Sequence, residues 1–402
     1  MAFILCTQDS KMKICILLLQ IAKCYALIPR LGGGGKDGDN HVQSWISHCE
    51  KVTNTIHHIV FQVLNILPSN KRQELNKPVI DIPDNQYDGG NILRQVYSYK
   101  AQIRVLCRCF VELHVTPAPF IKNVRPSIVF EFLKIVSKTH LSQIASGLSH
   151  ECKVVLAVMP DIHVSLIQLV NDFLKFGNDD LALFVPDIIN YIIQMLSDIR
   201  QVGGIRNSSK KSFAVLKESL CDLLITLCVT FGAGLGIEKY SHEIIPYLIS
   251  DIVPANETVT LNVNGSANKN TNKKHKKSSN QHFGLQQTNR ESIIQKTTNH
   301  LVSKSLIAVS SILKACGSFL SESCHKNIQC CIIGSAFDLQ QSNVQGRPIP
   351  FEDPNCRSSL YEALYALISN PHPRWPAPFR YGYRIFRHGN LNDFDPITLK
   401  NA

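Results

Sequence analysis

The sequence predicts an all-α protein, arranged as a HEAT- or armadillo-like α-solenoid with long disordered loops. Apolar residues recur every three or four positions along almost every ordered stretch, and sustained alternation with a period of two is absent. Several predicted helices also begin near a proline in the same local pattern. The 402 residues are 44% hydrophobic and 18% charged, which is enough apolar sequence to bury a large core. The alternative is a non-repetitive helical bundle, which has the same periodicity.

We expect residues 1–40 to be the least defined segment. Lys11 and Lys13 precede an uncharged apolar run, residues 14–22, which is too short to span a bilayer. The run has the features of a weak signal peptide, but its apolar residues also lie on one helical face, which favours a helix. The glycines at 32–35 then mark a flexible break. No association with a membrane is expected.

Residues 41–252 form the predicted helical-repeat region. Further helical repeats of the same solenoid are expected at residues 292–390, and residues 391–402 are a tail. The clearest apolar stripes, with spacings of three and four, cover residues 41–67, 92–115, 211–232 and 299–316.

Prolines support the solenoid prediction. Four predicted helix starts carry a proline, one further residue and then Ile or Leu, at Pro126, Pro160, Pro186 and Pro246. An apolar residue precedes the proline directly, except at Pro126, where Arg125 stands between it and Val124. Proline fits the first helical turn because the N–H that it lacks would have no partner there. The intervals of 34, 26 and 60 residues are irregular, as in stacked helix pairs of the HEAT and armadillo type.

Long polar stretches interrupt the helices. Residues 68–91 form one predicted loop, and residues 253–291, rich in Asn, Ser, Lys and Thr, form a predicted disordered basic loop. The second loop holds four lysines around one histidine: Lys273, Lys274, Lys276 and Lys277. Such a cluster matches the acidic groove of a nuclear import receptor, so we predict a nuclear-localisation signal. The alternative is a solvated charge run, and direct contact with RNA is left open because no aromatic residues are interleaved.

Leu220, Leu223 and Leu224 form an LxxLL sequence. On a helix the three leucines share one face and would fit the groove of a nuclear receptor. The same leucines lie on the apolar stripe of residues 211–232, however, which favours a place in the core. The docking motif is kept as the alternative.

Charge and cysteine usage limit the function classes. The net charge of +11 is too small to indicate nucleic-acid binding by itself. The 14 cysteines lie mostly at apolar positions without Cys-x-x-Cys pairs, which favours reduced thiols in the cytosol or nucleus. No catalytic, cofactor-binding or metal-binding motif is found, so we expect a protein that is not an enzyme and needs no cofactor.

The segment from Cys356 to Phe386 is the most distinctive part of the chain. A short amphipathic helix runs into four prolines within eight residues, which cannot continue a helix, and a second helix-like segment follows. This segment resembles the end of the helical domain in the proline-, glutamate- and leucine-rich protein family. The matching positions are Cys356, Arg357, Leu360, Tyr361, Leu364, Ala366, Leu367, Pro371, Pro373, Arg374, Pro376 and Pro378.

The resemblance continues in co-linear order over residues 120–388 and is weaker over residues 41–119. Further matching positions are Pro160–His163, Leu248–Ile252 and Ala315–Gly317. The chain departs from the family after Ala402, where the animal members have an acidic tail. Contacts that depend on this tail, with histones or chromatin, are therefore not carried over to this chain.

The resemblance implies a non-enzymatic scaffold in the nucleolus and nucleoplasm. It implies a Rix-type complex that matures the large ribosomal subunit and supports rRNA processing. The implied partners are a β-propeller subunit, an Ipi-type armadillo subunit, a SUMO protease, the AAA+ ATPase that remodels the pre-ribosome, and an import receptor. Self-association into a homo-oligomer through the helical domain is also implied. The alternatives are a nuclear-receptor transcriptional coregulator acting through the LxxLL motif, and a HEAT-type transport adaptor.

The proline-rich connector is the predicted partner surface. Its candidate contact residues are Arg374, Trp375, Pro376 and Pro378. A stiff, extended connector loses little conformational freedom on binding, and Arg and Trp are common anchors of interfaces. The alternative is that Trp375 packs internally between the flanking helices.

Overall fold

The computed structural model describes residues 8–31, 39–67, 80, 91–118, 120, 126–176, 179–205, 210–253, 284–341 and 350–374. Every regular element within these ranges is a helix and none is a strand, which confirms the predicted all-α class. The chain divides into two compact units, Met1–Ile237 and Glu238–Ala402.

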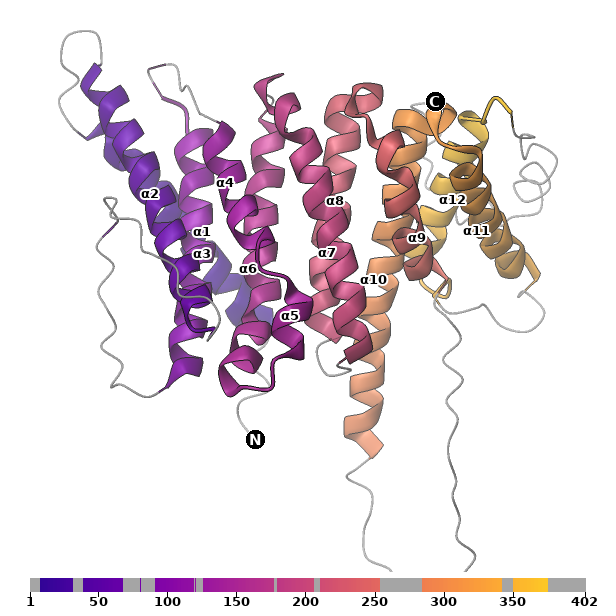
Figure 1. Ribbon diagram of the computed structural model, residues 1–402, viewed down its shortest axis with the longest axis horizontal. Coiled ribbons are helices and arrows are strands. Elements are labelled where there is room, and N and C mark those ends of the chain that lie inside the picture. Colours follow the sequence, from indigo (N-terminus) through magenta and orange to yellow (C-terminus); the bar gives the residue numbers. More distant parts are fainter. Residues whose placement is uncertain are drawn as a thin grey trace, which may run out of the picture. The chain divides into compact units, whose positions relative to one another are not determined.

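The first unit contains eight α-helices among its described residues. They are α1 (Gln8–Leu27), α2 (Asp39–Asn65), α3 (Ile92–Val115), α4 (Pro126–Ser137), α5 (Leu141–Ser146), α6 (His150–Lys175), α7 (Val185–Ile205) and α8 (Lys210–Phe231). In one row α6 lies between α3 and α8, and in a second row α4 lies between α2 and α7 (Figure 1). The rows are joined by contacts of α2 with α3, α4 with α6, and α7 with α8. Six of the eight helices therefore form two rows that contact each other, and the other two are α5, which packs against α6 and α7, and α1.

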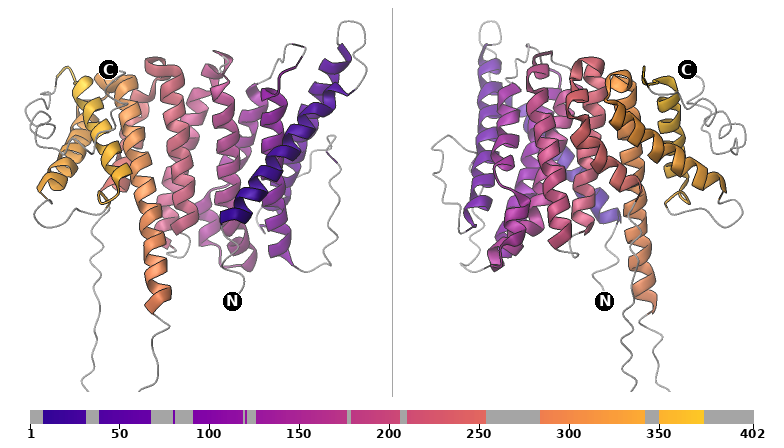
Figure 2. Two further views of the ribbon diagram at one scale, coloured as in Figure 1. Left: turned by 180° about the vertical axis from the view of Figure 1, so that it is seen from behind. Right: turned by 45° about the vertical axis from the view of Figure 1, so that its right-hand side comes forward.

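The helix α1 lies outside this two-row pattern. It packs against α3 and runs diagonally across it, as the left view of Figure 2 shows in indigo. A short 3-10 turn, Ile28–Arg30, follows α1 and contacts α2. The predicted helix over the apolar run of residues 14–22 is thus present as part of a longer helix.

The second unit repeats the pairing with four α-helices in its described residues. They are α9 (Ser241–Ile252), α10 (Gly284–Cys316), α11 (Glu322–Gln341) and α12 (Pro354–Ser369). The helix α9 contacts α10 and α11, and α12 contacts the same two helices. The helix α9, which ends the predicted helical-repeat region 41–252, thus packs against helices that follow it in the chain.

The start of α10 corrects the predicted extent of the basic loop. The helix begins at Gly284, inside the range 253–291 that we expected to be disordered. Polar sequence misled the prediction, because Gln, Thr, Arg and Glu are compatible with a helix and no proline or inner glycine interrupts this one.

Two of the four predicted helix starts at proline are wrong. Pro126 begins α4 and Pro186 is the second residue of α7, as expected. Pro160 and Pro246, however, lie inside α6 and α9. A proline inside a helix leaves the carbonyl four residues earlier without its usual N–H donor, at a cost of roughly 3 kcal/mol. In α6 this cost is offset by burial, because α6 is covered by α3, α4, α5 and α8.

Three helical stretches are long and apolar enough to cross a membrane, by length and composition alone: His150–Lys175, Leu181–Gly203 and Asn299–Phe319. Between 50% and 72% of each apolar window is buried inside the protein. Packing against neighbouring helices thus accounts for much of their apolar character.

Candidate functional site

Only part of the predicted interaction residues can be placed in the structure. The lysines at 273, 274, 276 and 277 lie outside the described residues, as do Trp375, Pro376 and Pro378. Arg374 is described, and it is exposed at the end of the segment that follows α12. The candidate site is therefore the base of the connector, where α12 ends.

The LxxLL leucines are part of the core. Leu220, Leu223 and Leu224 are 1%, 0% and 1% exposed, within α8. A receptor groove needs all three side chains at once, so the folded chain does not offer this motif for docking.

Polar contacts fix α12 on α10. The thiol of Cys356 donates to the carbonyl of Asn299 at 3.0 Å, and the hydroxyls of Ser303 and Ser359 lie 2.7 Å apart. Nearer the end of α12, the Lys314 ammonium lies 2.9 Å from the Glu362 carboxylate. These contacts run along the length of the helix pair, so α12 has one fixed register against α10.

The start of α12 is held by a buried arginine. Arg357 is 8% exposed, and its Nη1 donates to the carbonyls of Phe351 at 3.1 Å and Glu352 at 2.9 Å. The Asp353 side chain caps the same end of the helix by accepting from the N–H of Asn355 at 2.8 Å. The matching position Arg357 thus has a structural role here, because it closes the turn that leads into α12.

Asn370 ends α12 and touches a glycine. Its backbone N–H and its side-chain Nδ2 both donate to the Ala366 carbonyl, at 3.1 and 2.9 Å. A Cβ on Gly317 would lie 3.0 Å from the Cβ of Asn370 and 3.4 Å from its carbonyl oxygen. A side chain at position 317 would therefore force Asn370 to shift by a few tenths of an ångström, which favours glycine in the matching Ala315–Gly317 segment.

Two histidines hold the first residues of the connector. His325 on α11 is 1% exposed and donates from Nε2 to the Asn370 carbonyl at 3.4 Å. Its ring lies 5.5 Å, centre to centre, from that of His372, which is 9% exposed and accepts from the N–H of Arg374 at 3.1 Å. Burial lowers the pKa of His325, the hydrogen bond to Asn370 opposes this, and the nearby His372 lowers it further.

Two buried thiols lie on the helices of this region. Burial raises the pKa of the Cys356 thiol to about 11 and that of Cys316 to about 12, so neither is a nucleophile near neutral pH. Within the described ranges, no three His, Cys, Asp or Glu side chains are grouped so that they could hold a metal ion. The exposed Arg374 lies at the end of the first residues of the connector, and Asn370 and His372 hold these residues in place by hydrogen bonds.

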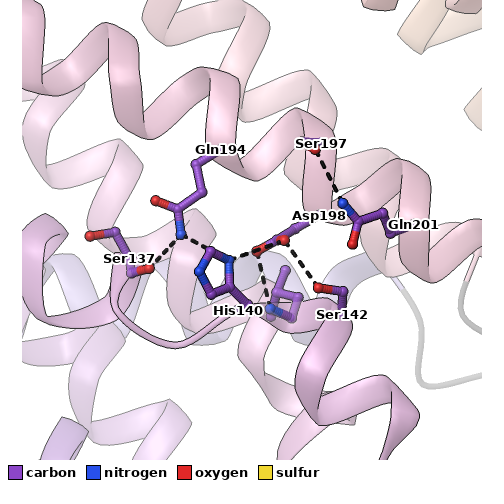
Figure 3. Close-up of polar contacts among 8 residues, drawn as sticks. Ser137, His140, Ser142, Gln194, Ser197, Asp198 and Gln201 are labelled. Carbon is purple, nitrogen blue, oxygen red and sulfur yellow. Dashed lines mark hydrogen bonds and ion pairs between the residues drawn. The ribbon is translucent and has the colours of Figure 1, made fainter.

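A second polar cluster, in the first unit, has no motif in the sequence. Asp198 on α7 is 3% exposed, and its carboxylate accepts from the Leu141 N–H at 3.1 Å and the Ser142 hydroxyl at 3.3 Å (Figure 3). His140 Nδ1 lies 3.4 Å from the same carboxylate. Gln194, one turn earlier on α7, donates to the Ser137 carbonyl. The two α7 side chains thus bind the short connection between α4 and α5.

A buried histidine and tyrosine join α6 to α7. His163 is fully buried, and its Nδ1 lies 2.7 Å from the Tyr191 hydroxyl. Burial lowers the pKa of His163 to about 3 and raises that of Tyr191. The pair is neutral at all ordinary pH values and acts as a polar contact inside the core.

Comparison with known proteins agrees with the resemblance. No family model matches the chain. The chain is 24% identical over 385 residues to the Proline-, glutamic acid- and leucine-rich protein 1 of Xenopus laevis. The matched region covers 92% of this chain and 36% of that protein. It is 22% identical over 399 residues to the protein of the same name from Mus musculus, and this match covers 94% of this chain and 34% of that protein. The chain thus spans about a third of the length of these curated relatives.

This similarity is distant homology, at 22–24% identity over more than nine tenths of the chain. It confirms the predicted resemblance, which was expected to be strong over residues 120–388 and weaker over residues 41–119, and covers more of the chain than these residues.

Truncation of an LxxLL leucine tests the core position. We expect Leu223→Ala to lower the free energy of unfolding by about 2–5 kcal/mol, because it leaves a cavity in a fully buried site. The matched control is Val229→Ala on the same helix, where the side chain is 77% exposed and the change should stay within about 0.5 kcal/mol. Denaturant unfolding gives both values, and an unchanged midpoint for Leu223→Ala would contradict the core position.

Two glycines of the second unit form a second test. Gly317→Ala should destabilise the protein by about 1–3 kcal/mol, because the new methyl group meets Asn370. Gly334→Ala, inside α11 where nothing lies within 4 Å, should instead stabilise it by about 0.5–1 kcal/mol. Thermal unfolding of the two variants should shift in opposite directions, and equal shifts would exclude the close contact at Gly317.

The buried His163 predicts a pH dependence. Its pKa is lower in the folded chain than the value of about 6.5 in the unfolded chain, so its contribution to stability is complete above pH 6.5. That contribution is lost as the pH falls towards 3, by about 1.4 kcal/mol per pH unit.

His163→Asn keeps a group that can bond to Tyr191 but does not titrate. Stability measured by denaturant unfolding between pH 6.5 and 4 should therefore fall less steeply for this variant. His242→Asn, an exposed control with 67% of its side chain accessible, should keep the parent slope. An unchanged slope for His163→Asn would contradict the assignment.

Proposed function

We propose that this chain, a distant homologue of the proline-, glutamic acid- and leucine-rich proteins, is a non-enzymatic scaffold of a Rix-type complex. In this role it acts in the nucleolus and nucleoplasm, in maturation of the large ribosomal subunit and rRNA processing. The observation that carries the proposal is the similarity to these relatives along more than nine tenths of the chain. The chain matches about a third of their length, so the proposal concerns their helical part.

The proposed architecture is a HEAT- or armadillo-like α-solenoid. It is supported by the same pairing in both units, where the first helices of successive pairs contact one another and so do the second helices. Stacked pairs expose long rows of helices, and such rows give partner proteins a large contact area without any catalytic group. This is the physical basis on which we assign a scaffold rather than an enzyme.

The proposed partners are those of a Rix-type complex. They comprise a β-propeller subunit, an Ipi-type armadillo subunit, a SUMO protease and the AAA+ pre-ribosome remodelling ATPase, with a second copy of this chain in a homo-oligomer. The connector after α12 is the proposed contact region, because its first residues are fixed by Asn370 and His372. Fixing the base of the connector lowers the entropy lost when a partner binds.

The transcriptional coregulator alternative is weakened by the buried leucines of α8. No particular observation favours the transport-adaptor alternative over the scaffold.

Affinity purification of the tagged chain from nuclei tests the proposal. We expect pre-ribosomal particles of the large subunit, identified by their precursor rRNA and by co-sedimentation with the chain in a gradient. Recovery of importins or coat proteins without pre-ribosomal factors would contradict the scaffold function. An Arg374→Ala variant, changed only at the exposed base of the connector, should lose a subset of the partners while it stays folded.

The lysine cluster gives a separate prediction about import. Replacing Lys273, Lys274, Lys276 and Lys277 with alanine should move a fluorescent fusion from the nucleus to the cytoplasm, because the import receptor recognises successive positive charges. Replacing the four lysines with arginine is the control and should keep nuclear accumulation. Continued nuclear accumulation of the alanine variant would show that these lysines are a solvated charge run only.

A further inference from the structure

The connector after α12 begins against a pair of buried histidines. His325 on α11 and His372 in the connector are 1% and 9% exposed, and their ring centres lie 5.5 Å apart. His325 Nε2 donates to the Asn370 carbonyl at 3.4 Å, and His372 Nδ1 accepts from the Arg374 N–H at 3.1 Å. We call these four residues the histidine latch, because they join the first residues of the connector to α11.

The hydrogen bonds of the histidine latch fix where the ring protons lie. The Nδ1 atom of His372 accepts a hydrogen bond and therefore carries no proton. A carbonyl oxygen only accepts, so His325 carries its proton on Nε2. His325 Nδ1 is buried and has no hydrogen-bond partner among the described residues. Both imidazoles are therefore neutral in this arrangement.

Protonation of either ring opposes the arrangement. A proton on His372 Nδ1 would remove the acceptor of the Arg374 N–H and put a second donor in its place. A proton on His325 Nδ1 would create a buried N–H without an acceptor, which costs more free energy than the same group in water. Because the rings are close together, a charge on one also disfavours a charge on the other.

Within the described part of the chain, no carboxylate pairs with the histidine latch. The helix α11 packs against α9 and α12, and α9 meets the start of α11 through the uncharged Ser241. The turn Gly317–Phe319, which touches Asn370, has no charged residue. The group that acts on the pKa of His325 through its charge is His372. The charged side chains of these helices are exposed or bonded elsewhere, and they include Glu322 and Lys326 on α11, Glu243 on α9, and Glu362 on α12, which pairs with Lys314.

The direction of the pH dependence follows from His325. Burial lowers its pKa, the hydrogen bond to Asn370 opposes this, and the nearby His372 lowers it further. A histidine released from these surroundings has the ordinary pKa of about 6.5. The proton therefore binds more readily to the released form. The closed arrangement is complete above a pH of about 6.5 and is lost progressively as the pH falls below that value.

We propose that the histidine latch is a proton-operated switch. Neutral imidazoles hold the base of the connector on α11, and uptake of protons from solvent by the two rings releases it while the helices of the second unit stay folded. The helices stay folded because α12 is fixed on α10 by contacts outside the latch, such as Cys356 with Asn299. The inference goes beyond the proposed function, which concerns partners and assigns no pH-dependent state to the chain.

Hydrogen exchange of the purified full chain, measured by mass spectrometry at pH values of about 7.5 and about 5.5, tests the proposal. Pro371 and Pro373 have no N–H, so residues 370–374 contain few amides, and the Arg374 amide reports its bond to His372. The measured rate is divided by the intrinsic exchange rate at each pH. The protection of Arg374 should fall by about tenfold at the lower pH, since that pH is about one unit below the ordinary histidine pKa.

Matched substitutions remove the titration and keep the hydrogen bonds. His372→Asn places an amide oxygen where Nδ1 accepts, and His325→Gln places an amide N–H where Nε2 donates. The double variant should have the same protection at both pH values. His372→Asn alone should keep most of the protection at the lower pH, and it decides the test if His325→Gln disturbs the fold. His242→Gln, at an exposed histidine on α9, is the control and should lose protection as the parent does.

Any of three results overturns the proposal. Equal protection of Arg374 in the parent chain at both pH values would show that the latch does not titrate. A fall in protection that persists in His372→Asn and in the double variant would assign the effect to another group. Simultaneous loss of protection along α12 would show that the second unit unfolds as a whole. Because only the purified chain is measured, these results leave the pre-ribosomal proposal to be judged by the nuclear purification.

Discussion

The structure depends on one constraint: a helix of this chain carries more apolar surface than one neighbour can cover. The helix α6 shows it most clearly, because its buried positions extend from Cys152 to Leu174 and include both sides of the helix. It is covered by α3 and α8 within its row and by α4 and α5 from the other row. Each of these helices therefore depends on its neighbours for the burial of its apolar surface.

Buried polar groups then decide how the connections between helices are made. The buried Asp198 and Arg357, and the half-buried Asn370, each bond to backbone groups of a turn or helix end. Such groups are costly to bury unless every hydrogen bond is formed, so they favour one arrangement of the turn over the alternatives. The connector after α12 begins from such a fixed turn, so its first residues have a defined conformation.

The sequence alone determined the helical class and the approximate places of most helices, because apolar spacing of three and four is a local property. It also indicated the distant similarity to the proline-, glutamic acid- and leucine-rich proteins, through residues such as Pro371 and Arg374 that stand close together in the chain. Tertiary structure decided the rest. Whether Pro160 begins a helix or lies within one depends on the helices that cover it, and the burial of Leu220, Leu223 and Leu224 depends on the neighbours of α8. The contacts of Asp198 could not be predicted, because the residues that bind Asp198 are more than fifty positions away.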